Sequence, residues 1–189
     1  MHGLVNVRLP QPGEIGEISL EQGPRGSYRA KTAIWSDSGN FKQSLYFTGI
    51  SEEGYRDDSG VDQQKASWLY EYTLANGIQM EGGFTYNNLN QETAGYVAGT
   101  KAYEDSNRRD TNPNPEAYRD SQSTRAWTRF TMESGDWEIT ATPYFREVNM
   151  SFVQHYLPGQ PIEDNEHRSI GVQIAAFREL SNNSTFSWG

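Results

Sequence analysis

The sequence predicts an all-β chain: an antiparallel up-and-down meander of about nine strands, forming part of a transmembrane β-barrel. Three observations support this fold class. Apolar and polar residues alternate with a period of two along many segments, the connections between these segments are alternately short and long, and aromatic residues are abundant in an otherwise polar chain. A membrane barrel combines these features because one face of each strand meets lipid, the other meets a polar lumen, and aromatic girdles mark both interfaces.

Composition favours such a barrel over a domain with one large core. Hydrophobic residues make up only 34% of the 189 residues and the mean hydropathy is -0.83, which is low for a domain that buries a single large core. Aromatic residues reach 13%, whereas unfolded chains are usually poor in them. The net charge of -9 disfavours nucleic acid as a partner, since that partner requires a basic surface. With no cysteine, disulfides, thiolate metal sites and cysteine nucleophiles are excluded.

The alternation is clearest in residues 65–74. One face is polar and carries Lys65, Ser67, Glu71 and Thr73; Leu69 is its single apolar residue. The other face is apolar and is predicted to contact lipid; its members are Ala66, Trp68, Tyr70, Tyr72 and Leu74. Most predicted strands reach the roughly 9 to 11 residues that cross a bilayer obliquely. Their approximate spans are 15–22, 28–36, 41–50, 63–74, 78–91, 123–132, 137–156, 168–180 and a start at Thr185.

The connections alternate in length along the chain. The short ones are rich in Gly, Asn, Asp and Ser, as hairpin turns require, and lie at residues 36–40, 75–77, 134–136 and 181–184. The long ones are polar insertions at residues 52–62, 93–121 and 157–167. This alternation predicts that all short turns lie at one end of the sheet and all long loops at the other. Outer-membrane barrels have that arrangement, with short periplasmic turns and long extracellular loops.

Several local patterns resemble the TonB-dependent receptors of the Gram-negative outer membrane. Residues 3–10, GLVNVRLP, are similar to the last strand of that family's plug domain. Residues 18–23 and 26–30 resemble its first barrel hairpin, and residues 53–57 resemble the end of its third strand. The resemblance implies two domains: the last plug strand and linker at residues 1–13, and the N-terminal part of the barrel at residues 14–189.

The family resemblance implies a function in transport. Members are barrels of about 22 strands, filled by a plug, that import metal chelates such as iron siderophores, or similar nutrients, with energy supplied through TonB. The implied partners are outer-membrane lipid, a small ligand such as an iron chelate, the plug domain and TonB. No apolar run approaches the roughly 20 residues of a membrane helix, and Met1-His2-Gly3-Leu4 does not begin a secretion signal. The chain is therefore expected to be a fragment of a longer receptor.

The long insertion at residues 93–121 is the predicted ligand-binding segment. Aromatic rings and guanidinium groups can stack on and pair with an anionic, aromatic chelate, and the candidates are Tyr96, Tyr103, Arg108, Arg109, Tyr118 and Arg119. The alternative interpretation is a polar surface loop without a ligand. Arg125 and Arg129 are predicted to point inward, where they line the lumen, contact the plug or form salt bridges within the lumen.

No enzyme, cofactor or metal site is predicted. His2, His155 and His167 lack metal-ligand spacing. The acidic residues at 163, 164 and 166 lack the glycine-spaced loop of a calcium hand, and the adjacent pairs at 52–53 and 57–58 define no catalytic geometry. Two other function classes remain open: a soluble β-sandwich carbohydrate-binding module with surface Trp and Tyr as sugar platforms, and a β-rich glycoside hydrolase, for which a convergent acid pair is missing.

Overall fold

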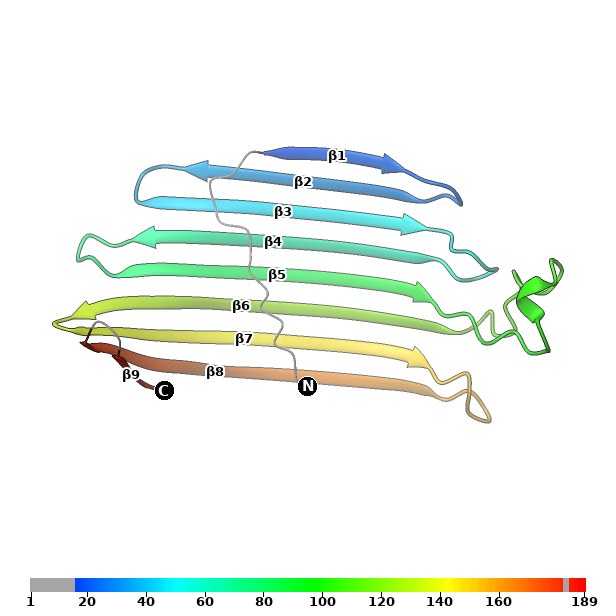
Figure 1. The fold of residues 1–189 in the computed structure, drawn as a ribbon. Helices are drawn as coiled ribbons and strands as arrows, with labels where there is room; N and C mark the ends of the chain where they lie inside the picture. The colour runs from blue at the N-terminus through cyan, green and yellow to red at the C-terminus, as the bar shows by residue number, and fades with distance from the viewer. Residues whose placement is uncertain (1–15, 182–183) are drawn as a thin grey trace.

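The computed structural model describes residues 16–181 and 184–189. These residues form one sheet of nine strands in which every strand is antiparallel to its neighbour in sequence (Figure 1). The strands are β1 (Glu17–Gln22), β2 (Tyr28–Asp37), β3 (Phe41–Glu52), β4 (Val61–Thr73), β5 (Gln79–Glu92), β6 (Tyr118–Ser134), β7 (Trp137–Val153), β8 (Ile162–Ser181) and β9 (Ser184–Trp188). A short 3-10 helix, η1 (Ala102–Glu104), lies between β5 and β6. The expected plug strand at residues 1–13 lies outside the described residues.

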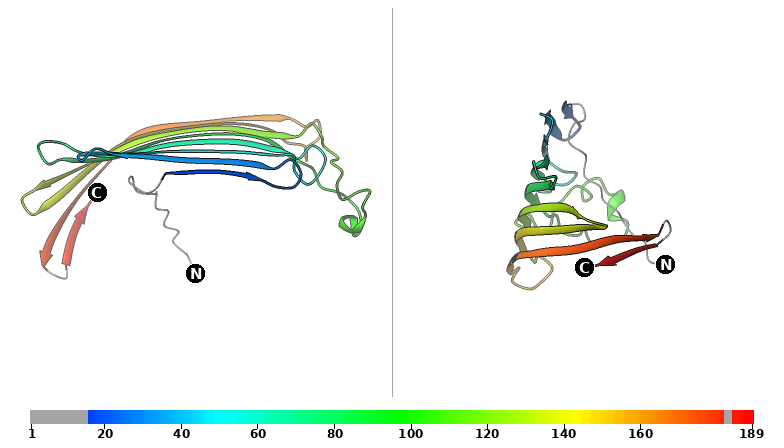
Figure 2. Two further views of the ribbon diagram at one scale, coloured as in Figure 1. Left: turned by 90° about the horizontal axis from the view of Figure 1, so that it is seen from above. Right: turned by 90° about the vertical axis from the view of Figure 1, so that its left-hand side faces the viewer.

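The predicted fold class is confirmed. The strands follow the order β1 to β9 without a crossover, so they make a meander in a single sheet and not the two packed sheets of a sandwich. The sheet is open and twisted, and the turn-side ends of β6 to β9 curl away from the plane of β1 to β5 (Figure 2). Within the described part of the chain, no helix has the length and apolar character needed to cross a membrane.

The register separates an apolar face from a polar face. Side chains alternate between the two faces of a strand, and one row of paired residues on the first face is Ile34, Leu45, Trp68, Phe84, Ala126, Phe145 and Ile170. We call the face that carries this row the apolar face and the opposite one the polar face. Ala66, Trp68, Tyr70 and Tyr72 share the apolar face, as predicted, while Leu74 lies in the turn after β4.

The apolar face is largely uncovered. Ile170 is 84% exposed and Leu20 is 81% exposed, although both belong to the face that carries the hydrophobic side chains. Within the described residues, the buried hydrophobic side chains are only Leu69, Ala102, Ala117 and Val153. The sheet therefore buries few of its hydrophobic side chains completely.

Three predicted strand boundaries differ from the structure by three or more residues. β6 begins at Tyr118 and not near residue 123, and β8 begins at Ile162 and not near residue 168. β7 correspondingly ends at Val153 instead of residue 156. In these extensions both faces of the strand carry polar side chains, so the period-two alternation disappears from the sequence. The backbone pairing of β7 with β8 nevertheless continues as far as Val153 and Ile162. The loops predicted at residues 93–121 and 157–167 are accordingly shorter, at 93–117 and 154–161.

Large rings cover glycines on both faces of the central strands. A Cβ atom built on Gly82 would lie 2.4 Å from Cζ of Tyr70, and one built on Gly171 would lie 2.7 Å from Oη of Tyr144. The Tyr70 hydroxyl lies 2.6 Å from Oγ1 of Thr128, close enough for a hydrogen bond. Gly82 and Gly171 therefore allow the close approach of these rings, because only a residue without a side chain leaves room for them.

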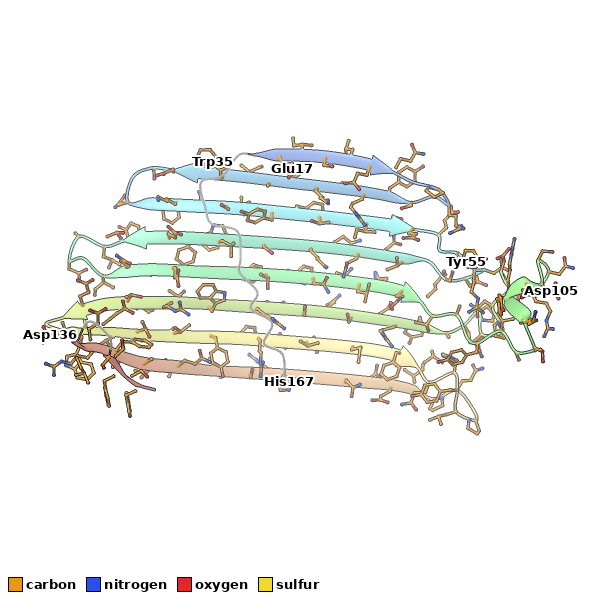
Figure 3. The ribbon with its side chains drawn as sticks, viewed as in Figure 1. Glu17, Trp35, Tyr55, Asp105, Asp136 and His167 are labelled. Atoms are coloured by element: carbon orange, nitrogen blue, oxygen red, sulfur yellow. The ribbon has the colours of Figure 1, made fainter. Side chains whose placement is uncertain are left out.

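The predicted short turns and long loops lie at opposite ends of the strands, but the short β1–β2 connection at residues 23–27 lies at the same end as the long loops. The described short turns contain glycines with positive φ, namely Gly39 at 81°, Gly77 at 86° and Gly135 at 62°, which is the conformation that tight hairpins require. Figure 3 shows Asp136 at this end and Tyr55 and Asp105 beyond the other end. The sheet thus has a turn end and a loop end.

Candidate functional site

At the loop end, the β3–β4 loop and the β5–β6 loop are joined by hydrogen bonds. The Arg56 guanidinium donates to the Thr111 carbonyl through Nε at 2.9 Å and through Nη2 at 2.6 Å. The Asp57 N–H donates to the Asp110 carbonyl at 2.8 Å. The Arg56 guanidinium thus holds the β5–β6 loop against the β3–β4 loop. Its hydrogen bonds are strong because the donor is charged.

Asn112 is the second junction between these loops. Its Nδ2 donates to the Asp58 carbonyl at 2.9 Å. Its Oδ1 accepts the backbone N–H of Gly95 at 3.2 Å and that of Asn114 at 2.9 Å. A single amide therefore uses both of its ends to tie together two parts of the β5–β6 loop and the β3–β4 loop.

The β1–β2 loop joins the same assembly. The Arg25 guanidinium lies 4.6 Å from the centroid of the Tyr55 ring, within the range of a cation–π interaction. The Glu53 N–H donates to the Arg25 carbonyl at 3.3 Å. We call residues 23–27, 53–60 and 93–117 together the loop cap.

The loop cap presents part of the predicted ligand-binding set to solvent. Tyr96 is 92% exposed and Tyr103 is 72% exposed. Arg108 donates to the Ala98 carbonyl, and Arg109 lies 3.6 Å from the Asp110 carboxylate. These rings and cations therefore come from one loop whose backbone is held by hydrogen bonds.

Tyr118 and Arg119 do not belong to the loop cap. Both lie in β6, where consecutive side chains point to opposite faces. The Tyr118 hydroxyl lies 3.4 Å from Oγ of Ser151, whereas Arg119 lies on the polar face, opposite Phe152 of β7. The structure therefore does not bring these two side chains together.

The residues that hold the loop cap, Arg56 and Asn112, were not among the predicted site residues. Each acts on a backbone carbonyl more than fifty positions away in the chain, and no local pattern in the sequence marks such a contact. The Pro and Asn residues around position 112 indicated only a loop.

On the polar face, Arg129 forms an ion pair with Glu81 at 2.8 Å. The salt-bridge interpretation of this residue is thus confirmed. Arg125 lies two residues earlier on the same face and is exposed. It stands opposite Arg146 of β7, so the two predicted inward arginines have different surroundings.

Two arginines bound the apolar stretch of β8. The Arg168 guanidinium lies 5.4 Å from the Phe145 ring centroid, and that of Arg178 lies 5.6 Å from the Trp137 ring centroid. Between them the apolar face carries Ile170, Val172, Ile174 and Ala176. About ten residues at roughly 3.3 Å each, tilted by about 40°, span about 25 Å, which matches the apolar band of a membrane β-barrel.

The described part of the chain contains no candidate metal cluster. No group of three or more His, Asp or Glu side chains there is placed to hold a metal ion. Glu163 lies on the polar face of β8 and Asp164 on the other, so these acidic residues do not converge. His155 contacts the ring of Tyr156 at the loop end, with centroids 5.7 Å apart, and His167 lies on the polar face.

The fold is similar to that of a solved structure. No family model matches the sequence, and no curated protein matches it. Among solved structures, the open form of the ferric-catecholate import receptor Fiu from E. coli K12 aligns with a TM-score of 0.67 and 14% sequence identity, over 93% of this chain and 33% of that receptor. The chain has the fold of part of that receptor. It spans about a third of the receptor's length.

Proposed function

We propose that this chain is part of an outer-membrane receptor that imports a metal chelate, such as an iron siderophore, or a similar small nutrient. The proposal depends on one observation: the sheet has an apolar band of about 25 Å, with short turns at one end and the hydrogen-bonded loop cap at the other. In the outer membrane the turns face the periplasm and the loop cap faces the exterior. The fold shared with an import receptor supports this assignment.

Within this proposal the chain supplies the first strands of a TonB-dependent barrel. Residues 1–13 are the exit strand of the plug and its linker, and residues 14–189 form the N-terminal part of the barrel. The partners of the whole receptor are outer-membrane lipid, the plug domain and TonB. The open edges of β1 and β9 pair with further strands, because an unpaired edge is not tolerated in lipid. The role is in transport and involves no catalysis.

The proposed ligand-binding surface is the loop cap, with Tyr118 and Arg119 at its base. Tyr96 and Tyr103 supply exposed rings, and Arg108 and Arg109 supply cations on the same loop. Rings and guanidinium groups together suit a ligand that is both aromatic and anionic. The hydrogen bonds of Arg56 and Asn112 keep the loop in one conformation, which reduces the entropy lost when a ligand binds.

A labelling experiment tests the membrane assignment directly. The chain contains no cysteine, so single cysteines can be placed in it by V172C and Q173C and labelled after the receptor that carries this chain is reconstituted into lipid vesicles. These neighbours lie on opposite faces near the middle of the apolar band. A fluorophore at position 172 is expected to be quenched by spin-labelled lipid and one at position 173 by a water-soluble quencher. The same quenching pattern at both positions would contradict the proposal.

A further inference from the structure

Two arginines stand directly opposite each other on the polar face. Arg125 of β6 pairs with Arg146 of β7, and both side chains are exposed. Opposed residues in an antiparallel pair have Cβ atoms about 4.5 to 5.5 Å apart, where like charges destabilise the sheet. A pair of this kind gains stability when an anion binds between the two guanidinium groups.

The described structure supplies no such anion. Among residues 16–181 and 184–189, no carboxylate lies within 4.0 Å of either guanidinium. Arg146 has only a neutral acceptor, because its Nε donates to Oγ of Ser169 at 2.6 Å. The remaining positions around the pair on this face carry no acid; they are Thr85, Asn87, Ser123, Val148 and His167.

Several other cations of the polar face are paired with acids. Arg129 lies 2.8 Å from Glu81. Arg29 and Lys31 both lie within 3.5 Å of Glu21. Arg125 and Arg146 differ in this respect from Arg29 and Arg129, which each have a carboxylate beside them.

Two aromatic rings lie beside the arginine pair. Trp127 and Tyr144 are opposed in the next row of the same face. Each ring covers a glycine of the outer neighbouring strand: a Cβ on Gly83 would lie 2.9 Å from Nε1 of Trp127, and one on Gly171 would lie 2.8 Å from Cζ of Tyr144. Each ring therefore rests with one side on the backbone, and both are only partly buried.

We infer that Arg125, Arg146, Trp127 and Tyr144 form a binding site for an aromatic oxyanion, a ring that bears a carboxylate or a phenolate. The two guanidinium forks bind the oxyanion through charge-assisted hydrogen bonds. The rings contact the aromatic part of the ligand, as offset or edge-on aromatic pairs do. This site lies on the polar face of the sheet, apart from the loop cap. Binding of the oxyanion to it can be measured whether or not the proposed transport function is correct.

The test is a titration of the refolded chain in detergent with naphthalene-2-carboxylate. Binding is measured by ligand-observed NMR. R125Q and R146Q are each expected to weaken binding by about 10-fold, since each removes a charge-assisted contact. R129Q is the matched control, because its arginine lies on the same strand and face but is paired with Glu81. It is expected to leave binding unchanged.

Two further probes separate the contributions of charge and ring. Naphthalene-2-carboxamide keeps the ring without the charge, and acetate keeps the charge without the ring; both are expected to bind at least 10-fold more weakly. R146K keeps the charge but loses the fork, and an intermediate loss is expected. Absence of carboxylate binding, equal binding of the carboxamide, or equal losses in R129Q and R125Q would overturn the inference.

Discussion

Substitution of Val172 by arginine gives the sharpest test of the two-faced sheet. Val172 lies on the apolar face near the midpoint between Arg168 and Arg178, and its side chain is 58% exposed in the isolated sheet. V172R therefore removes little packing within the sheet. Its main effect is to place a cation at the centre of the apolar band, which costs about 2 to 4 kcal/mol in a bilayer.

The neighbouring position supplies the control. Gln173 lies on the polar face of the same strand, and Q173R is expected to change the free energy of unfolding by less than about 0.5 kcal/mol. A third variant, A176R, lies close to the margin marked by Arg178 and is expected to cost about 0 to 1 kcal/mol. The three variants thus differ in face or depth while sharing one strand and one introduced residue.

The assay is urea unfolding in phospholipid vesicles, with unfolding followed by tryptophan fluorescence. The order expected for the loss of stability is V172R, then A176R, then Q173R. Equal losses for V172R and Q173R would refute the assignment of the faces. Equal losses for V172R and A176R would instead refute the depth scale that Arg168 and Arg178 define.

Two further predictions concern the glycines under rings and the loop cap. G171A is expected to destabilise the fold by about 1 to 3 kcal/mol, since the new Cβ displaces the Tyr144 ring. The control is G49A, where a Cβ would meet only ordinary contacts at 3.6 Å, and it should change stability by less than about 1 kcal/mol in the same unfolding assay. Equal losses of stability in the two variants would argue against the ring contact. N112A is expected to speed proteolytic cleavage within residues 93–117, because it removes the amide that ties this loop to Asp58; unchanged cleavage would show that the loop cap does not depend on this residue.

The sequence was sufficient to predict strands where the two faces differ in polarity. In β4 and β5 the alternation marked both the strands and their orientation, because the apolar face has to carry hydrophobic side chains over the whole band. Where β6 and β8 extend beyond the band, at Tyr118 and Ile162, no such demand acts on either face. Residues there are polar on both sides, and the backbone ladder continues without leaving a pattern in the sequence.

The opposition of Arg125 and Arg146 could have been predicted from one turn. The tight turn at Gly135 and Asp136 pairs Ser134 with Trp137, and in an antiparallel hairpin that pairing sets the partner of every residue further along both strands. No turn or local sequence pattern predicts the contacts of the loop cap in this way. The Arg56–Thr111 and Asn112–Asp58 contacts join loops across a strand pair, so they depend on the folded path of both loops.

The level of the arginine pair connects the two proposals. Arg146 and Ser169 pair in the row next to Glu147 and Arg168, so the proposed anion site lies level with the margin of the apolar band on the loop side. From the loop end along β6, Arg119 comes first, then Arg125 beside Arg146, and then Arg129, whose charge Glu81 offsets. Among the described residues, β6 and β7 thus carry arginines without an acid partner nearer the loop end and a paired arginine nearer the turn end. This order favours binding of an anion at the Arg125–Arg146 pair over binding nearer the turn end of the same strands.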